Sequence, residues 1–182
     1  MPTVTANRTV LLHSAVPAVI GIVAAVIIGA DGGIPSALMM CAAIYLVAAA
    51  VGHPAAAWWG FAGTLPLIAL GDLLGNEWVS LGALGIAQLI ILMAGQRRRA
   101  WNHRHNQLQV VAAAGFAVLA IAAATGAPTA AALIVIVGLL AHAAWDLAYH
   151  HAGTVVTRSY AAFCAGFDLA LAIAVAVALL GQ

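Results

Sequence analysis

The chain has 182 residues, of which 65% are hydrophobic, six are Lys or Arg and five are Asp or Glu, with a mean hydropathy of +1.10. In a soluble domain about a quarter of the residues are charged. This composition therefore excludes a soluble domain and predicts an all-α polytopic membrane protein. The net charge of +1 leaves no basic surface for nucleic acid. Lysine is absent, which excludes a retinal Schiff base and a phosphate-loop lysine.

Apolar windows separated by Gly, Pro and charged residues predict seven transmembrane helices and no strand. The predicted spans are residues 9–30, 34–51, 55–74, 78–95, 108–125, 129–149 and 156–180. Pro17 and Pro66 fall inside spans, where each removes a backbone donor and is expected to kink its helix. Because the spans use nearly the whole chain, residues 1–182 are predicted to form one transmembrane domain.

The arginines predict the orientation of these spans. With seven helices, every arginine falls on one side of the membrane, whereas Asp31 and Glu77 fall on the other. The positive-inside rule then places the N-terminus in the cytoplasm and the C-terminus outside. We expect a multi-pass protein of a cell membrane, in a bacterium the inner membrane.

The order of helices and turns also suggests an internal duplication. Residues 9–75 and 108–181 each show a helix, a turn with Gly and Pro, a second helix that ends near a histidine, and a third helix. Pro35 and His53 would correspond to Pro128 and His150. With residues 78–95 as a linker helix, the two units form a 3+1+3 arrangement of parallel repeats, as in several small transporters.

Two predicted spans carry polar side chains at helical spacing. In the sixth, His142, Asp146 and His150 follow one another at intervals of four residues, which places them on one stripe of a helix. In the seventh, Tyr160, Cys164 and Asp168 repeat this spacing. The aromatic residues beside these two stripes are Trp145, Tyr149, Phe163 and Phe167.

These two spans are joined by a short turn and must be antiparallel neighbours. Asp168 is expected about 15 Å along its helix, close to the depth of His142. Polar groups that face lipid are costly, so the two carboxyls and the histidine should meet inside the bundle. A packing pair is the simpler alternative, although interhelical polar contacts contribute only about 0.6 kcal/mol on average. His142, Asp146 and His150 have a spacing that can share a metal, but no HExxH or paired histidine motif accompanies them, so we predict no metal and no other cofactor.

The segment Ala144-Trp145-Asp146-Leu147-Ala148-Tyr149, together with Asp168 in the last helix, resembles the Trp-acid-aromatic signature and second acid of small seven-helix integral-membrane terpene cyclases. This resemblance implies an enzyme that cyclises an isoprenoid by protonating it. The family carries one acid in an early helix, whereas the second span here offers only Tyr45 and Cys41.

Two functions are compatible with a polar site inside the membrane. In the first, an enzyme acts on a lipid or isoprenoid, since a carboxylic acid buried in hydrocarbon can keep its proton and donate it. Asp168 would be the acid, and Asp146 or His142 would position it or take a proton back. The residues expected to contact substrate, some of them facing a cationic intermediate, are Trp145, Tyr149, His150, Tyr160, Phe163, Cys164 and Phe167. The alternative is a small proton-coupled transporter or channel that uses the same acids and histidine. The expected partners are the substrate and membrane lipids.

Overall fold

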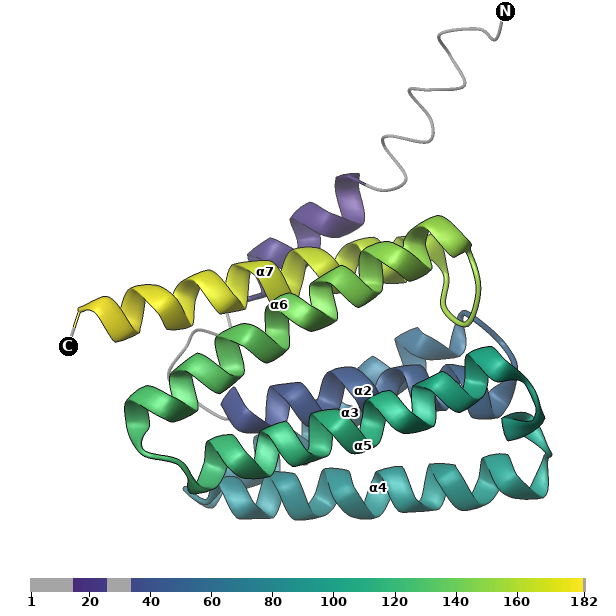
Figure 1. The fold of residues 1–182 in the computed structure, drawn as a ribbon, viewed down its shortest axis with the longest axis horizontal. Coiled ribbons are helices and arrows are strands. Elements are labelled where there is room, and N and C mark those ends of the chain that lie inside the picture. The colour runs from purple at the N-terminus through teal and green to yellow at the C-terminus, as the bar shows by residue number, and fades with distance from the viewer. Residues whose placement is uncertain (1–14, 26–33, 182) are drawn as a thin grey trace, which may run out of the picture.

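A computed structural model describes residues 15–25 and 34–181, which form seven α-helices and no strand. The helices are Ala15–Ala25, α2 (Ile34–Val51), α3 (Ala56–Leu73), α4 (Glu77–Arg97), α5 (Arg104–Thr125), α6 (Pro128–Ala152) and α7 (Arg158–Leu180), with a short 3-10 turn η1 (Ala100–Asn102) before α5. Figure 1 shows α2 to α7 as a bundle of roughly aligned helices, with the N-terminal helix crossing at one side. The predicted all-α fold class is therefore confirmed.

Four of these helices, α4 to α7, are long and apolar enough to cross a membrane. Large apolar side chains also cover the outside of the bundle, among them Leu73, Ile86, Val111, Val137 and Val177. Exposure of this much apolar surface to water would be unfavourable, whereas contact with lipid tails is not. The chain is a helical membrane protein.

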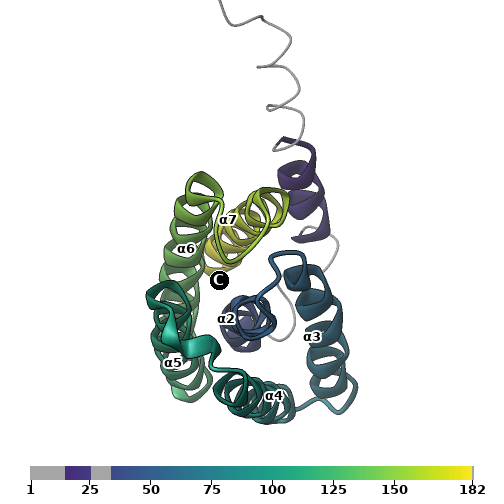
Figure 2. The same ribbon diagram turned by 90° about the vertical axis from the view of Figure 1, so that its right-hand side faces the viewer.

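Helix α2 lies at the centre of the bundle. In the end-on view of Figure 2, helices α3 to α7 surround it. From Ser36 to Ala50 only Val47 is more than marginally accessible, and the remaining side chains are buried. A helix that is apolar on every side can be buried on every side, which explains why α2 shows no amphipathic stripe. Its alanines let the neighbouring helices pack closely around it.

From residue 34 on, the predicted helix ranges agree with the observed ones to within two residues, except at the end of α6, which continues to Ala152, and around the arginine-rich linker. Helix α4 continues to Arg97 and α5 already begins at Arg104. Arg and Gln are good helix formers, so the helices extend past the apolar windows by which the spans were delimited. The chain turns at Arg99, which has a left-handed φ of 56°, and Trp101 then donates its Nε1 hydrogen to the carbonyl oxygen of Leu92 at 3.0 Å.

Helices α6 and α7 form an antiparallel hairpin, as the short connecting turn predicted. Helix α6 begins with Pro128 at its first turn, and ends at Gly153, whose φ of 63° suits a residue without a side chain. Thr157 caps α7, because its hydroxyl oxygen accepts a hydrogen bond from the backbone N–H of Tyr160 at 3.2 Å. This hairpin brings the two polar stripes of the sequence face to face.

The N-terminal helix packs across α7 through two glycines. A β-carbon at Gly166 would overlap the backbone oxygen of Ala18, and one at Gly21 would overlap the backbone oxygen of Phe163. The rest of the first predicted span, with Arg8 and Asp31, lies outside the described residues. Pro66 stays inside a continuous α3.

Candidate functional site

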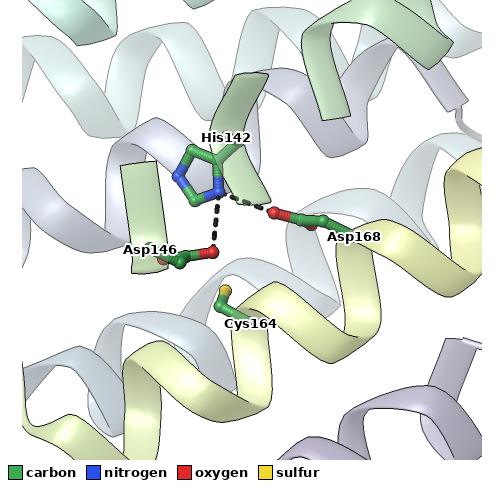
Figure 3. A group of neighbouring side chains, drawn as sticks. All are labelled: His142, Asp146, Cys164 and Asp168. Atoms are coloured by element: carbon green, nitrogen blue, oxygen red, sulfur yellow. Dashed lines mark hydrogen bonds and ion pairs between the residues drawn. The ribbon is translucent and has the colours of Figure 1, made fainter. Parts of the chain in front are cut away.

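A buried cluster of ionisable side chains lies between α6 and α7. The Nδ1 atom of His142 lies 2.6 Å from Asp168 Oδ2 and 3.2 Å from Asp146 Oδ2. Figure 3 shows both contacts leaving the same ring nitrogen, with the sulfur of Cys164 turned towards the carboxyls. His142, Asp146 and Asp168 are each at most 1% exposed. The predicted meeting of two carboxyls and a histidine inside the bundle is confirmed, while their catalytic role stays a prediction.

A second layer of hydroxyl and thiol groups surrounds this cluster. Tyr45 donates its hydroxyl hydrogen to Asp146 Oδ1 at 2.6 Å, and Cys41 donates to Asp168 Oδ1 at 3.4 Å. Cys164 Sγ lies 3.3 Å from the hydroxyl oxygen of Tyr160. Each carboxyl therefore has one oxygen held by α2 and the other turned towards His142. This arrangement fixes both acids in orientation.

Asp146 Oδ2 is buried and makes no hydrogen bond, so its only polar contact within the described bundle is the ion pair with His142. A single ring N–H cannot bond well to two acceptors at once. The ligand atoms of His142, Asp146, Cys164 and Asp168 all lie within 4.8 Å of one another and can hold a metal ion. The prediction that no metal binds rested on the residue spacing within the sixth span alone. That spacing does not include the thiol that α7 contributes.

The sequence prediction placed His150 in the same stripe as His142 and Asp146, and the structure corrects this. His150 lies near the α6–α7 turn, where its Nδ1 is 3.0 Å from the carbonyl oxygen of Arg158. Eight residues advance a helix by 80° beyond two full turns, whereas seven residues fall only 20° short of them. Tyr149, seven residues after His142, therefore faces the interior in place of His150.

A column of polar side chains leads from the cluster to one end of the bundle. The ring of Tyr45 packs edge-on against that of Tyr149, with centroids 5.4 Å apart. Gln109 donates one Nε2 hydrogen to the Tyr149 hydroxyl at 2.5 Å and another to the carbonyl oxygen of His105 at 3.0 Å. Beyond lies a cavity of about 390 Å³ lined by residues that include His103, His105, Asn106 and Thr154. We call this the arginine end, because it is where the arginine-rich linker and the α6–α7 turn meet.

On the opposite side of the cluster, leucines from three helices form the next layer of the interior. Leu38 lies one turn before Cys41 on α2, Leu139 one turn before His142 on α6, and Leu171 one turn after Asp168 on α7. All three are at most 4% exposed. Leu38 also packs directly on Gly138, where any β-carbon would collide with it. The polar column therefore meets these three leucines, which we call the apolar plug, on the far side of the cluster.

An apolar pocket of about 660 Å³ lies on the other face of the α6–α7 pair, next to the N-terminal helix. Its floor includes Ala143 and Gly166, which neighbour the cluster residues in sequence, and its walls include Ile22, Leu147 and Leu169. None of the cluster residues lines this pocket.

The predicted substrate-contact residues do not gather in one place. Phe163 and Phe167 stack on each other at 6.2 Å, and Phe163 packs on Trp58 and Phe61 of α3, away from His142. Trp145 is half-buried, with its ring 5.4 Å from that of Tyr149. Tyr160 and Cys164 border the cluster, and His150 lines the apolar pocket.

Sequence reasoning did not assign roles to the residues that α2 and α5 contribute. The rings in contact with His142 are those of Tyr45 at 5.6 Å and Phe116 at 5.3 Å. Cys41 and Tyr45 are four residues apart and, with Ser36, are the polar side chains of an otherwise apolar α2. That spacing was a usable signal for a shared face. The contribution of Gln109 had no such signal, because glutamine near a helix start is ordinary.

The described residues define a helical membrane protein with a buried histidine and aspartate centre, which polar side chains connect to the arginine end. In comparisons with known proteins, no family profile, curated protein or solved structure matches the chain. The similarity to membrane terpene cyclases therefore remains a prediction that rests on the residues of the sixth and seventh spans.

Proposed function

We propose that this protein is a membrane enzyme that carries out acid–base chemistry on a lipid or isoprenoid substrate. The observation that supports this most is the sharing of one histidine nitrogen between the carboxyls of Asp146 and Asp168 at 3.2 and 2.6 Å in a dry interior. A packing contact needs one acid, and a second one buried beside the first is costly unless it has a use. Asp168 donates the proton, His142 returns one to it, and Asp146 balances the charge of the histidine.

The apolar pocket supplies the chemistry for holding such a substrate. Its volume of about 660 Å³ lies in the range of small-molecule sites, and its lining is almost wholly aliphatic. A lipid or isoprenoid chain enters it directly from the membrane. None of the acids lines this pocket, so substrate binding must part α6 and α7 locally to expose Asp168.

The polar column supplies protons from the arginine end. Gln109, Tyr149 and Tyr45 lead from the cavity there to Asp146. In this proposal the hydroxyls of Tyr149 and Tyr45 and the carboxyl of Asp146 pass protons along, while Gln109 orients the hydroxyl of Tyr149. An enzyme needs this one-sided connection only, because the column replaces the proton that Asp168 gives to the substrate and no proton has to cross the membrane.

A small proton-coupled transporter is the second candidate, and the same polar column favours it. A transporter must also release its proton or solute on the far side of the membrane. In the described residues the plug of Leu38, Leu139 and Leu171 is buried on that side of the cluster. Transport therefore requires this plug to open, whereas acid–base catalysis does not.

The topology belongs to the same proposal. We propose that all seven helices span the membrane, with the arginine end and the N-terminus in the cytoplasm of a bacterial cell and the C-terminus outside. The two units 9–75 and 108–181 would then run parallel. The proton supply of the enzyme would come from the cytoplasm.

Substitution of Asp168 by Asn tests the enzyme proposal. Asn keeps the size of the side chain and its capacity for hydrogen bonds while removing the carboxyl proton. Loss of acid catalysis should lower product formation about 100- to 10,000-fold, while the melting temperature stays close to that of the wild type. Product is measured from the isoprenoid and lipid pools of a host that expresses each variant. Asp72→Asn, a change of an exposed acid, is the matched control and should keep full activity.

The same variants in liposomes distinguish the second candidate. Proton flux that depends on Asp168, with no product in the host, would favour the transporter. Product and flux that are unchanged in Asp168→Asn would contradict both proposals. In that case the cluster would only hold α6 and α7 together, and Asp168→Ala should then unfold the protein.

A further inference from the structure

We propose that His142, Asp146, Cys164 and Asp168 form a binding site for one divalent transition-metal ion of the Zn²⁺ type. The ligand atoms are His142 Nδ1, Asp146 Oδ2, Cys164 Sγ and Asp168 Oδ2. This inference goes beyond the proposed function. A metal ion would bind to the same atoms that carry the protons in the proposed acid–base reaction.

The geometry of the four atoms suits a tetrahedral ion. They come from two neighbouring helices, are all buried, and lie within 4.8 Å of one another. Zinc bonds of about 2.0 to 2.3 Å imply ligand atoms about 3.3 to 3.8 Å apart. The distance of 3.2 Å between His142 Nδ1 and Asp146 Oδ2 is already close to this spacing. The shorter contact with Asp168 needs a side-chain adjustment of about 1 Å.

The donor set selects the kind of ion. One imidazole nitrogen, one thiol sulfur and two carboxylate oxygens form a mixed set that zinc accepts and that calcium and magnesium, which prefer oxygen alone, do not. Both carboxyls point one oxygen inward and would bind through a single atom. Four ligands also complete a tetrahedron.

The second layer of the cluster has the arrangement expected around metal ligands. Tyr45 holds the outer oxygen of Asp146, and Cys41 holds the outer oxygen of Asp168. Tyr160 contacts the sulfur of Cys164 at 3.3 Å. Outer partners of this kind orient ligands and commonly change metal affinity about 10- to 100-fold when removed. Three of the four ligands are therefore already oriented by groups that do not themselves belong to the site.

The charges of the cluster and its hydrogen bonds also favour a bound cation. Two carboxyls face one histidine in an interior that holds no arginine among the described residues. Asp146 Oδ2 is fully buried and makes no hydrogen bond, although it points into the centre of the cluster. A divalent cation would supply this oxygen with a partner and offset both carboxylate charges.

Bound metal must displace the protons of its ligands. The metal-loaded protein can therefore not donate a proton from Asp168, and we expect metal binding to inhibit the acid–base reaction. Metal binding itself does not depend on the proposed enzyme activity. A failure of one proposal leaves the other to be judged by its own measurement.

The test uses the full-length protein purified in detergent, stripped with a chelator and titrated with Co²⁺ as a spectroscopic substitute for Zn²⁺. Elemental analysis should give about one Zn²⁺ per chain after dialysis. The Co²⁺ form should show the intense visible bands of a tetrahedral ion and a sulfur-to-cobalt charge-transfer band in the near ultraviolet. Exposed histidines such as His103 and His151 can bind metal but cannot give that band, because both cysteines are buried.

The two cysteines provide a matched pair of variants. Cys164→Ser should abolish the charge-transfer band, whereas Cys41→Ser should keep it. Tyr45→Phe should weaken Co²⁺ binding about 10- to 100-fold without changing the band position. His142→Ala should lose stoichiometric binding, with thermal melting and gel filtration to show that the variant is folded.

Several outcomes would overturn the metal site. They are the absence of the sulfur band in the wild type, its persistence in Cys164→Ser, or equal metal content in the wild type and in folded His142→Ala. If wild-type binding and the band are found but Zn²⁺ does not inhibit product formation, the metal site stands and the expected inhibition by bound metal is wrong.

Discussion

Tyr45 and Asp146 are 101 residues apart in sequence, yet their hydrogen bond of 2.6 Å is among the contacts that orient the buried cluster. Without the hydroxyl, Asp146 would have no hydrogen bond and would keep only its ion pair with the histidine that it shares with Asp168. An acceptor buried without a partner costs about 1–3 kcal/mol, and more if it is charged. The functional geometry of the acids therefore depends on a residue of the central helix.

Tyr45→Phe should lower the free energy of unfolding by about 1–3 kcal/mol in the wild type. In an Asp146→Leu background, which removes the acceptor as well, the same change should cost much less. The two single variants and the double variant form a cycle that yields the coupling energy from denaturant unfolding in detergent. Additive effects would show that this hydrogen bond contributes nothing to the fold.

At the scale of the helices, glycines determine how closely the elements approach. Gly166 on α7 and Gly21 on the N-terminal helix remove the two side chains that would keep these helices apart. Leu38 of α2 reaches α6 where Gly138 leaves room. Lipid supplies no hydrophobic force that would drive helices together, so the packing contacts of such a close approach must stabilise the bundle instead.

Gly166→Ala should destabilise the protein by about 1–3 kcal/mol, because the new methyl group would overlap the backbone of Ala18. Gly115→Ala on α5 is the matched control, since no atom lies near its β-position. That variant should be neutral or slightly more stable, as alanine favours a helix over glycine by about 1 kcal/mol. Thermal melting in detergent measures both, and equal stability of the two variants would argue against the close helix crossing.

For the whole molecule, the proposed orientation can be tested by labelling with a membrane-impermeant maleimide. In a background with Cys41 and Cys164 changed to Ser, Leu74→Cys should react in intact cells. Arg98→Cys and Arg158→Cys should react only after the membrane is opened. All three sites are exposed at helix ends. Labelling of Arg98→Cys in intact cells would reverse the orientation and, with it, the side from which protons are supplied.

Much of the fold followed from local patterns in the sequence. Helix positions could be predicted because apolar windows of membrane length alternate with Gly, Pro and charged residues. His142 and Asp168 could be paired because a short turn forces α6 and α7 to be neighbours, and helical spacing then gives their depth. Prediction of His150 in the same stripe was wrong because the helix period of 3.6 favours Tyr149 at that distance.

The sequence by itself determined the class of protein, the ranges of most helices and the hairpin that joins the two acids with His142. Only the tertiary structure decided that α2 lies at the centre, since an apolar helix has no marked face to show which neighbours it will contact. That central position brings Tyr45 and Cys41 to the acids and Gln109 to Tyr149. It also sets the apolar plug on one side of the cluster and the polar column on the other. Contacts between distant helices depend on how whole surfaces pack, and no local spacing in the chain encodes them.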